Sequence, residues 1–263
     1  KTLRTFEQKT IVSQTNQGLS TTRNKAISLA KGKVLALLDA DDLWQPQYLK
    51  EIHQLSLNFP EASLFGTDYI EFYSQSLQLQ PRKNIPKAKR DTTFIVNDFF
   101  DASLFQPITV PSSFVFKKEV FETIQFNEAV TFAEDIEFYI KTNLNYKMAF
   151  CFKPLVTSRQ DIPNQMTKIG FKGKKLPDLS QFENDTKQNS SLKKYTETYR
   201  YYWLSQSRIS NDLEHIILLK NNLNPNYLSY KQRFLLHMPV FLLKRLKQLK
   251  SFLLKRKIRV TSY

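Results

Sequence analysis

Hydrophobic and polar positions alternate in blocks along the first part of the chain, and the blocks predict helices and strands in turn. Ser20–Lys31 has apolar residues at helical spacing, and Gly32 ends that helix. Val34–Leu38 is a run of five apolar residues, which is typical of a strand buried on both faces. A helix over Pro46–Asn58 and a strand over Ala62–Tyr73 follow. This alternation predicts an α/β fold with a mostly parallel sheet flanked by helices.

Beyond Tyr73 the pattern becomes more broken. Gln75–Thr92 is polar and basic, which predicts a mobile surface loop that touches substrate. Shorter elements are predicted over Val96–Leu104, Ser113–Phe116, Lys118–Ile124 and Met148–Val156, with a helix that opens at Ala133-Glu134-Asp135. Proline and glycine after Arg159 place a domain boundary near Pro177. We therefore expect domains at residues 1–177 and 178–263, the second being a helical C-terminal appendage with long helices over Tyr195–Lys220 and Ser229–Arg256.

Composition adds that the chain can fill a core, with 41% hydrophobic residues including 21 Phe and 12 Tyr. The one cysteine, Cys151, lies in an apolar run, which predicts a buried structural thiol and leaves no internal disulfide. A reducing, cytoplasmic location is expected. Since the chain begins at Lys1 in the middle of a pattern, we also expect a fragment or a processed product.

The formal charge of +15 is concentrated at the C-terminus, where Val240–Tyr263 holds eight basic residues and no acids. Leucines recur there at helical spacing (Leu242, Leu246, Leu249, Leu253), which predicts a basic amphipathic helix. One interpretation is peripheral attachment to an anionic membrane surface at the inner face. The alternative is a helix that packs its leucines on the rest of the protein. Nucleic acid is not expected as a partner, because the tail interleaves leucine rather than stacking aromatics.

Three carboxylates, Asp39, Asp41 and Asp42, follow the predicted strand at Val34–Leu38. Like charges this close repel one another unless they are solvated or a cation lies between them. Carboxylate oxygens suit Mg²⁺ or Mn²⁺, and ligands of α/β sheets bind beyond the carboxyl ends of the strands. The alternative is a solvated turn in which Asp42 caps the helix that opens near Pro46.

Several motifs occur in a fixed order. They are Asn16-x-Gly18-x-x-x-x-Arg23-Asn24, Lys31-Gly32, Asp39-Ala-Asp41-Asp42 with Trp44 and Pro46, then Pro111–Phe121, Phe126, Glu134-Asp135, and finally Arg159 with Asn164 and Thr167. Together they cover about residues 10–167, and this part of the chain resembles the inverting family 2 glycosyltransferases of the GT-A, Rossmann-like fold.

The resemblance implies transfer of a sugar from a nucleotide diphosphate sugar to an acceptor hydroxyl, with inversion, in the synthesis of cell-surface polysaccharide or glycolipid. Asp39 and Asp41 match the family's DxD metal-binding motif, which implies Mn²⁺ or Mg²⁺ as cofactor, with Asp41 as the first metal ligand. Asp135 matches the general base, and Glu134 would tune its electrostatics or bind the acceptor. The acceptor would be a glycan or a lipid-linked molecule.

The nucleotide-sugar-binding residues that the resemblance implies are Asp39, Arg23, Asn24 and Arg159. Ordinary alternatives stand beside these roles. Glu134 and Asp135 also suit the first turn of any helix through its dipole. Arg23 also suits a pair with a nearby acid, and Arg159 suits a solvated loop.

The family's opening strands, with a Pro-x-Tyr-Asn-type motif and an Asp-Asp-Gly-Ser-like turn, are not found in this sequence. These strands would bind the nucleotide base, so the chain as given is expected to be inactive in turnover. The rival hypothesis is therefore a catalytically inactive glycosyltransferase-like fragment that acts as an assembly partner.

Overall fold

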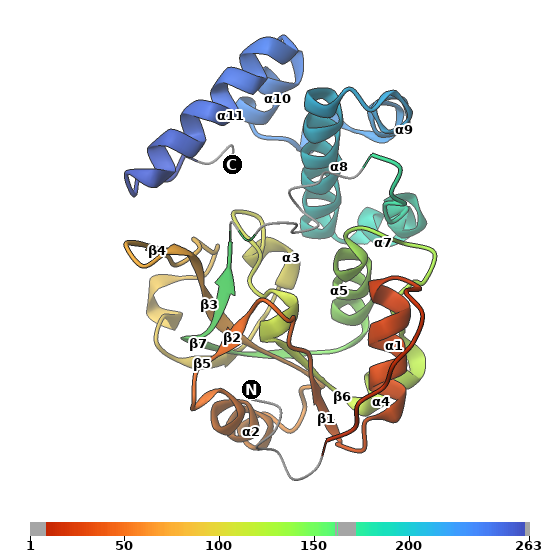
Figure 1. Cartoon of the computed structure of the whole chain (residues 1–263), viewed down its shortest axis with the longest axis vertical. Coiled ribbons are helices and arrows are strands. Elements are labelled where there is room, and N and C mark those ends of the chain that lie inside the picture. The colour runs from red at the N-terminus through yellow and green to blue at the C-terminus, as the bar shows by residue number, and fades with distance from the viewer. Residues whose placement is uncertain (1–8, 161, 163–171, 261–263) are drawn as a thin grey trace.

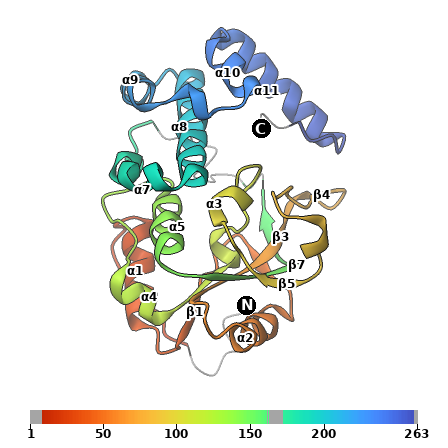
Figure 2. The ribbon, with the colours of Figure 1, turned by 180° about the vertical axis from the view of Figure 1, so that it is seen from behind.

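The structure is a computed structural model that describes residues 9–160, 162 and 172–260. Figure 1 shows a curled sheet with helices packed around it, and a group of C-terminal helices at one end of the long axis. The view from behind in Figure 2 places α2 (Tyr48–Asn58) at the opposite end of the molecule from α8 to α11. The predicted α/β class and the helical C-terminal region are thus confirmed.

The sheet has seven strands in the described residues, in the order β1-β6-β3-β7-β2, with β4 paired to β3 and β5 to β7. The strands are β1 Val34–Ala36, β2 Leu43–Trp44, β3 Leu64–Ser74, β4 Leu77–Leu79, β5 Thr93–Ile95, β6 Phe114–Lys117 and β7 Met148–Arg159. Only β3 and β7 are parallel, and the other described pairs are antiparallel. The prediction of a mostly parallel sheet is therefore wrong.

Chain connectivity explains this difference. A parallel pair needs a crossover connection, and the chain between β3 and β7 includes α4 and α5, which are long enough to provide one. β4 follows β3 through a tight turn after Ser74, so the two strands form an antiparallel hairpin. β6 enters the sheet between β1 and β3 and runs against both of them.

β1 was predicted to be buried on both faces, but it lies at one end of the strand order. Only Leu35 in it is buried, whereas Val34 is 37% exposed and Leu38, just beyond the strand, is 48% exposed. β1 is three residues long and pairs with β6 alone, so the described residues cover it incompletely.

The helices are α1 Leu19–Leu29, α2 Tyr48–Asn58, α3 Phe99–Ala102, α4 Lys118–Thr123, α5 Glu134–Asn145, α7 Glu183–Gln188, α8 Ser190–Ser210, α9 Leu213–Asn222, α10 Tyr230–His237 and α11 Val240–Lys255. Short 3-10 turns occur at Lys87–Lys89, Pro111–Ser113, Leu179–Phe182 and Pro225–Tyr227. The short strand predicted over Thr10–Ser13 is not formed.

Each of the two long C-terminal helices that the pattern predicts is divided. Asn211 takes a left-handed conformation (φ 56°) after α8, and the Asp212 side chain caps α9. Pro239 separates α10 from α11, since proline lacks an amide hydrogen and cannot continue a helix.

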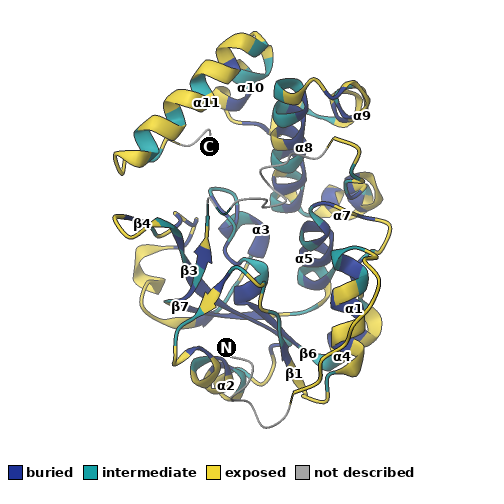
Figure 3. Cartoon of the chain, viewed as in Figure 1, coloured by how far each residue is buried: buried dark blue, intermediate teal, exposed yellow. Residues whose placement is uncertain are grey.

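Both faces of the sheet are covered. On one face α2 packs Tyr48, Ile52 and Leu55 against Phe65 and Val156 of the central strands. On the other face a larger core gathers side chains from α1, α3, α5 and the C-terminal helices. Figure 3 shows the buried sheet and α5, and the largely exposed α11.

The C-terminal helices share this larger core with the α/β part of the chain. Tyr195 of α8 lies 6.1 Å from Phe99 and 5.4 Å from Phe100 of α3, measured between ring centroids. Leu179, which follows the boundary predicted near Pro177, is also part of the core. The division into residues 1–177 and 178–263 stays a prediction.

The basic segment at Gln75–Thr92 was predicted to be a mobile loop, but one of its own side chains anchors it to the sheet. Lys83 forms an ion pair with Asp68 of β3, and both side chains are fully buried. Gln80 donates a second hydrogen bond to Asp68 at 2.6 Å. Burial lowers the pKa of Lys83, while Asp68 opposes that shift. Because a broken buried ion pair is costly, this contact holds the segment against the sheet.

Candidate active site

The acidic segment connects the two ends of the strand order. β1 pairs with β6 at one end, and β2, only a few residues later, pairs with β7 at the other. The residues between Ala36 and Leu43 therefore cross the sheet. Leu43 lies opposite Thr157, close to where β7 ends at Arg159. The acids lie at the carboxyl ends of the parallel pair, which is the part of an open sheet where ligands bind.

Ser112, at the entry to β6, holds this crossing segment in place. Its hydroxyl accepts a hydrogen bond from the backbone amide of Asp39 at 3.0 Å, and its carbonyl accepts one from the Trp44 indole at 2.7 Å. Trp44 in turn stacks on Tyr48 with ring centroids 4.5 Å apart. Sequence reasoning assigned Ser112 no role, although it lies within the Pro111–Phe121 motif.

Arg23 of α1 joins the acidic segment to α5. One guanidinium nitrogen donates to Asp39 at 2.9 Å, and the other donates to Glu134 at 2.7 Å. The Arg23 and Glu134 side chains are 7% exposed, and the Asp39 side chain is 32% exposed. Burial acts to lower the pKa of Arg23, but the two carboxylates outweigh it and raise this pKa above its ordinary value. The guanidinium is therefore permanently charged.

Asp135 is half-buried in the first turn of α5, directly after Glu134. Burial, followed by the negative charge of Glu134, raises the pKa of Asp135 to about 7, and Arg23 opposes the shift. Within the described residues no cation lies within salt-bridge distance of Asp135. A carboxyl group with this pKa exchanges a proton near neutral pH, which a general base must do.

Asp42 and Arg159 are brought together at the other end of the acidic segment. The Asp42 carboxylate accepts a hydrogen bond from the backbone amide of Arg159 at 3.1 Å. The Arg159 guanidinium donates to the carbonyl oxygen of Asp41 at 2.7 Å. Asp42 does not cap α2, whose N-cap is Gln47. Burial raises the pKa of Asp42.

Asn24 lies apart from the acidic segment. Its side chain bonds to both the amide (3.1 Å) and the carbonyl (2.9 Å) of Phe126, and to Glu128 at 3.0 Å. These contacts fix the turn that precedes α5. The nucleotide role of Asn24 stays a prediction. Asn164 and Thr167 lie outside the described residues.

Asp39 and Asp41 carry the oxygen donors that a hard divalent cation prefers. One oxygen of Asp39 is bound to Arg23, and Asp41 is half-exposed. In the described part of the chain no three His, Cys, Asp or Glu side chains form a ready metal cluster. This donor set fits an ion that takes one or two carboxylates and completes its shell with substrate phosphates and water.

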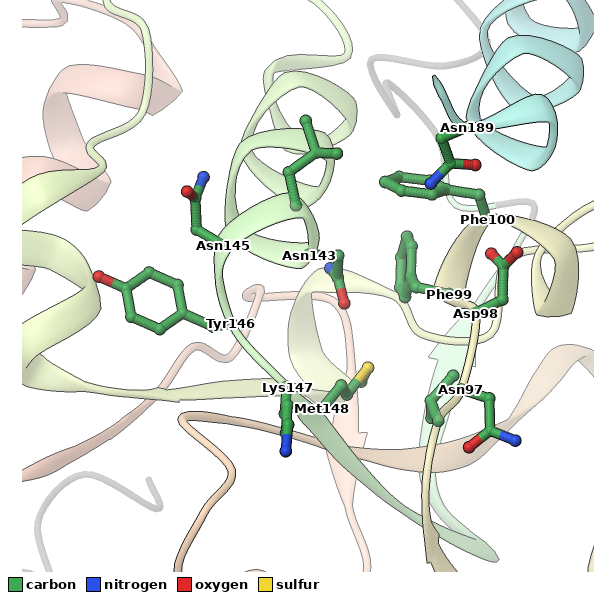
Figure 4. A pocket seen from close by; sticks show the side chains of 12 residues that line it. Asn97, Asp98, Phe99, Phe100, Asn143, Asn145, Tyr146, Lys147, Met148 and Asn189 are labelled. Atoms are coloured by element: carbon green, nitrogen blue, oxygen red, sulfur yellow. The ribbon is translucent and has the colours of Figure 1, made fainter. Parts of the chain in front are cut away.

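A separate pocket of about 310 Å³ lies between the start of α3 and the end of α5. Figure 4 shows its amide and aromatic lining, including Asn97, Asn143, Tyr146 and Asn189. It contains no residue of the acidic segment, so it is distinct from the candidate active site.

The chain is thus an α/β protein whose candidate site is a network of acids, Arg23 and Arg159 at the carboxyl end of a parallel strand pair. Residues 3–125 match the model of glycosyl transferase family 2. These residues, slightly less than half of the chain, are similar to that family, which confirms the resemblance seen in the sequence.

Two curated relatives are also glycosyltransferases by name, and both are described as uncharacterized. The protein from Methanocaldococcus jannaschii is 27% identical over 157 residues, which is 59% of this chain and 51% of the relative. The protein from Nostoc sp. is 29% identical over 115 residues, covering 42% of this chain and 34% of the relative. This chain therefore matches about half of the first relative and a third of the second.

Among solved structures, the chain is similar to residues 1–349 of TarS from S. aureus, with a TM-score of 0.46 and 16% identity over 79% of this chain and 64% of that chain. A TarS structure in complex with UDP-GlcNAc matches with a TM-score of 0.45 and 16% identity, covering 59% of this chain and 43% of that chain. At these scores the fold assignment rests on the sheet itself and on the family match.

Proposed function

We propose that this chain contributes the active site of a glycosyltransferase that moves a sugar from a nucleotide diphosphate sugar to an acceptor hydroxyl with inversion. The observation that carries the proposal is the double contact of Arg23. It ties Asp39, on the donor side, to Glu134, which opens the helix that bears the candidate base. One buried guanidinium thus positions both the donor side of the site and the start of the helix that carries the candidate base.

In this proposal Asp135 is the general base that takes the proton of the acceptor hydroxyl as its oxygen attacks the anomeric carbon. A pKa of about 7 supports the role, because the group is partly ionised at neutral pH yet basic enough to accept a proton. Glu134, held by Arg23, supplies the adjacent negative charge that keeps this pKa high.

Asp39 and Asp41 are the residues proposed to hold Mn²⁺ or Mg²⁺, which when bound would neutralise the charge on the departing nucleotide diphosphate. Asp41 is assigned the main contact, because Arg23 already occupies one oxygen of Asp39. Arg159, which is hydrogen-bonded to the Asp41 carbonyl, is positioned beside the same phosphates. Asp42 holds the segment in register through the Arg159 amide.

The acceptor is proposed to be a glycan or lipid-linked molecule in cell-surface synthesis, with the protein at the cytoplasmic face of the membrane. Support comes from α10 and α11, because the chain carries no acid after Glu214. In the described residues no helix is both long and apolar enough to span a membrane. The proposed contact with the membrane is therefore peripheral.

Calorimetry with UDP and GDP, each with and without Mn²⁺, tests the donor side. In a version of the protein that also carries the strands that bind the nucleotide base, we expect nucleotide binding that depends on Mn²⁺, and we expect Asp41→Ala to abolish that dependence. Glu122→Gln, a change at an exposed acid of α4, is the control and should bind like the unchanged chain. Metal-dependent binding that survives in Asp41→Ala would remove Asp41 from the site.

A further inference from the structure

A groove of about 310 Å³ lies between α8 and α11, away from the acidic segment. Its residues come from these two helices, from α10, from Gln106 and from the chain after α11. Apolar walls are formed by Tyr201, Tyr202, Ile209, Leu235, Leu243 and Leu246. Figure 1 shows α11 extending across the same end of the molecule as the tips of β3 and β4.

The polar part of the groove is cationic. Lys247, Lys250 and Arg259 line it, and none of the described residues that line it carries a carboxylate. Burial and the nearby Lys231 lower the pKa of Lys250, so positive charge is crowded at this place. Of these three side chains, only Arg259 has an acidic partner among the described residues, namely Glu71 of β3 at 2.7 Å. An anion in the groove would relieve this repulsion.

Two hydrogen-bonding atoms at the groove are buried and lack a partner in the described part of the chain. They are the second terminal nitrogen of Arg259 and the hydroxyl of Ser205. A buried polar atom without a partner is destabilising, so such atoms are rare in natural proteins. Both atoms can donate to the oxygen of an anion.

The apolar surface extends beyond the groove along the outer side of α11. Phe241, Leu242, Leu249 and Phe252 are 66%, 41%, 50% and 51% exposed. A free phosphate ion gains nothing from contact with this apolar surface, whereas the acyl chain of a lipid can bury it. A basic helix with large apolar side chains on its outer face is suited to lie in the membrane interface.

The groove is also connected to the candidate active site through the sheet. Arg259 pairs with Glu71, which lies opposite Ser158 in the β3–β7 register. The next pair, Phe72 and Arg159, ends beside the acidic segment. A molecule held by Arg259 would therefore lie near the same carboxyl end of the sheet as Asp41.

We propose that this groove binds the phosphate of an anionic lipid, while the outer face of α11 lies against the membrane. The lipid phosphate would contact Lys247, Lys250 and Arg259. The use of this lipid to carry or present the acceptor rests on the proposed sugar transfer, whereas the binding itself does not. On this proposal, the acceptor of the sugar is carried by a lipid that bears a phosphate.

Sedimentation of the full chain with vesicles tests the binding. We expect binding to an equal mixture of phosphatidylcholine and phosphatidic acid, and little binding to phosphatidylcholine alone. Two charges lost near an anionic surface weaken binding roughly 30-fold wherever they lie on the helix. Lys247→Gln with Lys250→Gln should weaken it by clearly more than this, because these two side chains also lose charge-assisted hydrogen bonds to the lipid phosphate. The matched control is Lys244→Gln with Lys255→Gln, which removes the same charge from α11 outside the groove.

If the two double variants lose vesicle binding equally, the proposal that the groove binds the lipid is overturned. Equal losses would indicate general attraction of basic side chains to the anionic vesicle surface. A second arm measures short-chain, soluble phosphatidic acid and inorganic phosphate by calorimetry. We expect the lipid to bind and the groove variant to lose it. Equal affinity for inorganic phosphate would overturn the assignment to a lipid.

The same variants also separate this proposal from the proposed function. Binding of UDP with Mn²⁺, measured without lipid in a version of the protein that also carries the base-binding strands, should be unchanged in the groove variant. A chain that binds the lipid but no nucleotide would contradict the sugar-transfer proposal alone. If the nucleotide binds, but the groove variant loses no more lipid binding than the control variant does, then the lipid-binding proposal alone is contradicted.

Discussion

Two buried ion-pair networks in this protein use the same residue types to different effect. In the candidate active site one cation, Arg23, holds two acids, Asp39 and Glu134, and a third acid, Asp135, stands beside them without a partner in the described residues. Negative charge is therefore in excess. A site with surplus negative charge attracts a cation or keeps a proton, and here burial, followed by the charge of Glu134, raises the pKa of Asp135 to about 7.

The second network, in α7 and α8, is balanced. Lys193 and Arg200 each contact both Glu183 and Glu197, at 2.7 to 3.2 Å. Burial acts to raise the pKa of Glu183, but hydrogen bonds from the two cations outweigh it and lower this pKa. Since each charge here is matched, the network neither attracts a ligand nor stores a proton. We therefore expect the network around Arg23 to act in the reaction, and the network in α7 and α8 to stabilise the fold.

The largest expected effect is on catalysis. In a version of the protein that also carries the strands that bind the nucleotide base, Asp135→Asn should reduce turnover of a panel of nucleotide diphosphate sugars by about 10² to 10⁴, the usual contribution of a general base. Binding of UDP with Mn²⁺ should remain, because Asp135 is not among the residues proposed to hold the metal ion. Glu122→Gln is again the control. A loss of nucleotide affinity at unchanged turnover would contradict the role.

The same variant has a distinct effect on stability. Native Asp135 keeps its proton up to about pH 7, whereas the unfolded carboxyl loses it near its ordinary value of 3.8. The native state therefore binds more protons in this window, and the free energy of unfolding falls as the pH rises through it. In Asp135→Asn this decline should be smaller, as measured by urea unfolding at pH 5 and pH 8. An identical decline in both proteins would mean that Asp135 titrates normally.

The next effect concerns the balanced network. Glu197 is fully buried and also accepts a hydrogen bond from the Asn224 amide at 2.9 Å. Glu197→Ala should lower the free energy of unfolding by about 3–5 kcal/mol, because it leaves the buried Arg200 with only half of its charge partners. Urea unfolding measures the change, and binding of UDP per folded molecule should not change.

The control for this variant is Glu183→Ala in the same network. The Glu183 side chain is 43% exposed, so water can replace part of what is lost and the cost should be clearly smaller. If the two variants cost the same, burial does not decide the strength of this network. If Glu197→Ala abolishes nucleotide binding in folded protein, the division between chemistry and stability is wrong.

The pattern of the sequence predicted those features that depend on neighbours along the chain. α2 and α5 have apolar residues at helical spacing, and both formed close to the predicted bounds. The acids after Val34–Leu38 did lie at a strand end, as did Arg159. The alternative in which Asp42 caps a helix is wrong, because Gln47 is the N-cap of α2 and the Asp42 carboxylate accepts a hydrogen bond from the Arg159 amide.

Features that depend on distant contacts were not predictable in this way. Arg23 and Glu134 are 111 residues apart, and Asp39 and Ser112 are 73 residues apart. No local periodicity encodes such pairs. The direction of β6, and with it the mostly antiparallel sheet, also depends on how separate segments meet.

The smallest expected effect tests whether backbone strain accompanies the unbalanced network. Ala133, directly before Glu134, has a left-handed conformation with φ 61° and ψ 33°. An alanine in this region costs about 1–2 kcal/mol, and strain of this kind is concentrated at functional sites. In the C-terminal helices the comparable position is Asn211, a residue type that tolerates this conformation.

Ala133→Gly should therefore stabilise the protein by up to about 1 kcal/mol, since relief of the strain exceeds the roughly 0.4–1 kcal/mol that glycine adds to the entropy of the unfolded chain. Thermal unfolding measures the change. Ala129→Gly is the matched control, because Ala129 lies in the same connection without a positive φ and should only lose stability. If both variants are destabilised equally, the backbone before Glu134 is not strained. If only Ala133→Gly is stabilised, and its turnover also falls, then strain at Ala133 positions Glu134 and Asp135 for the reaction, and the unbalanced network has a mechanical as well as an electrostatic component.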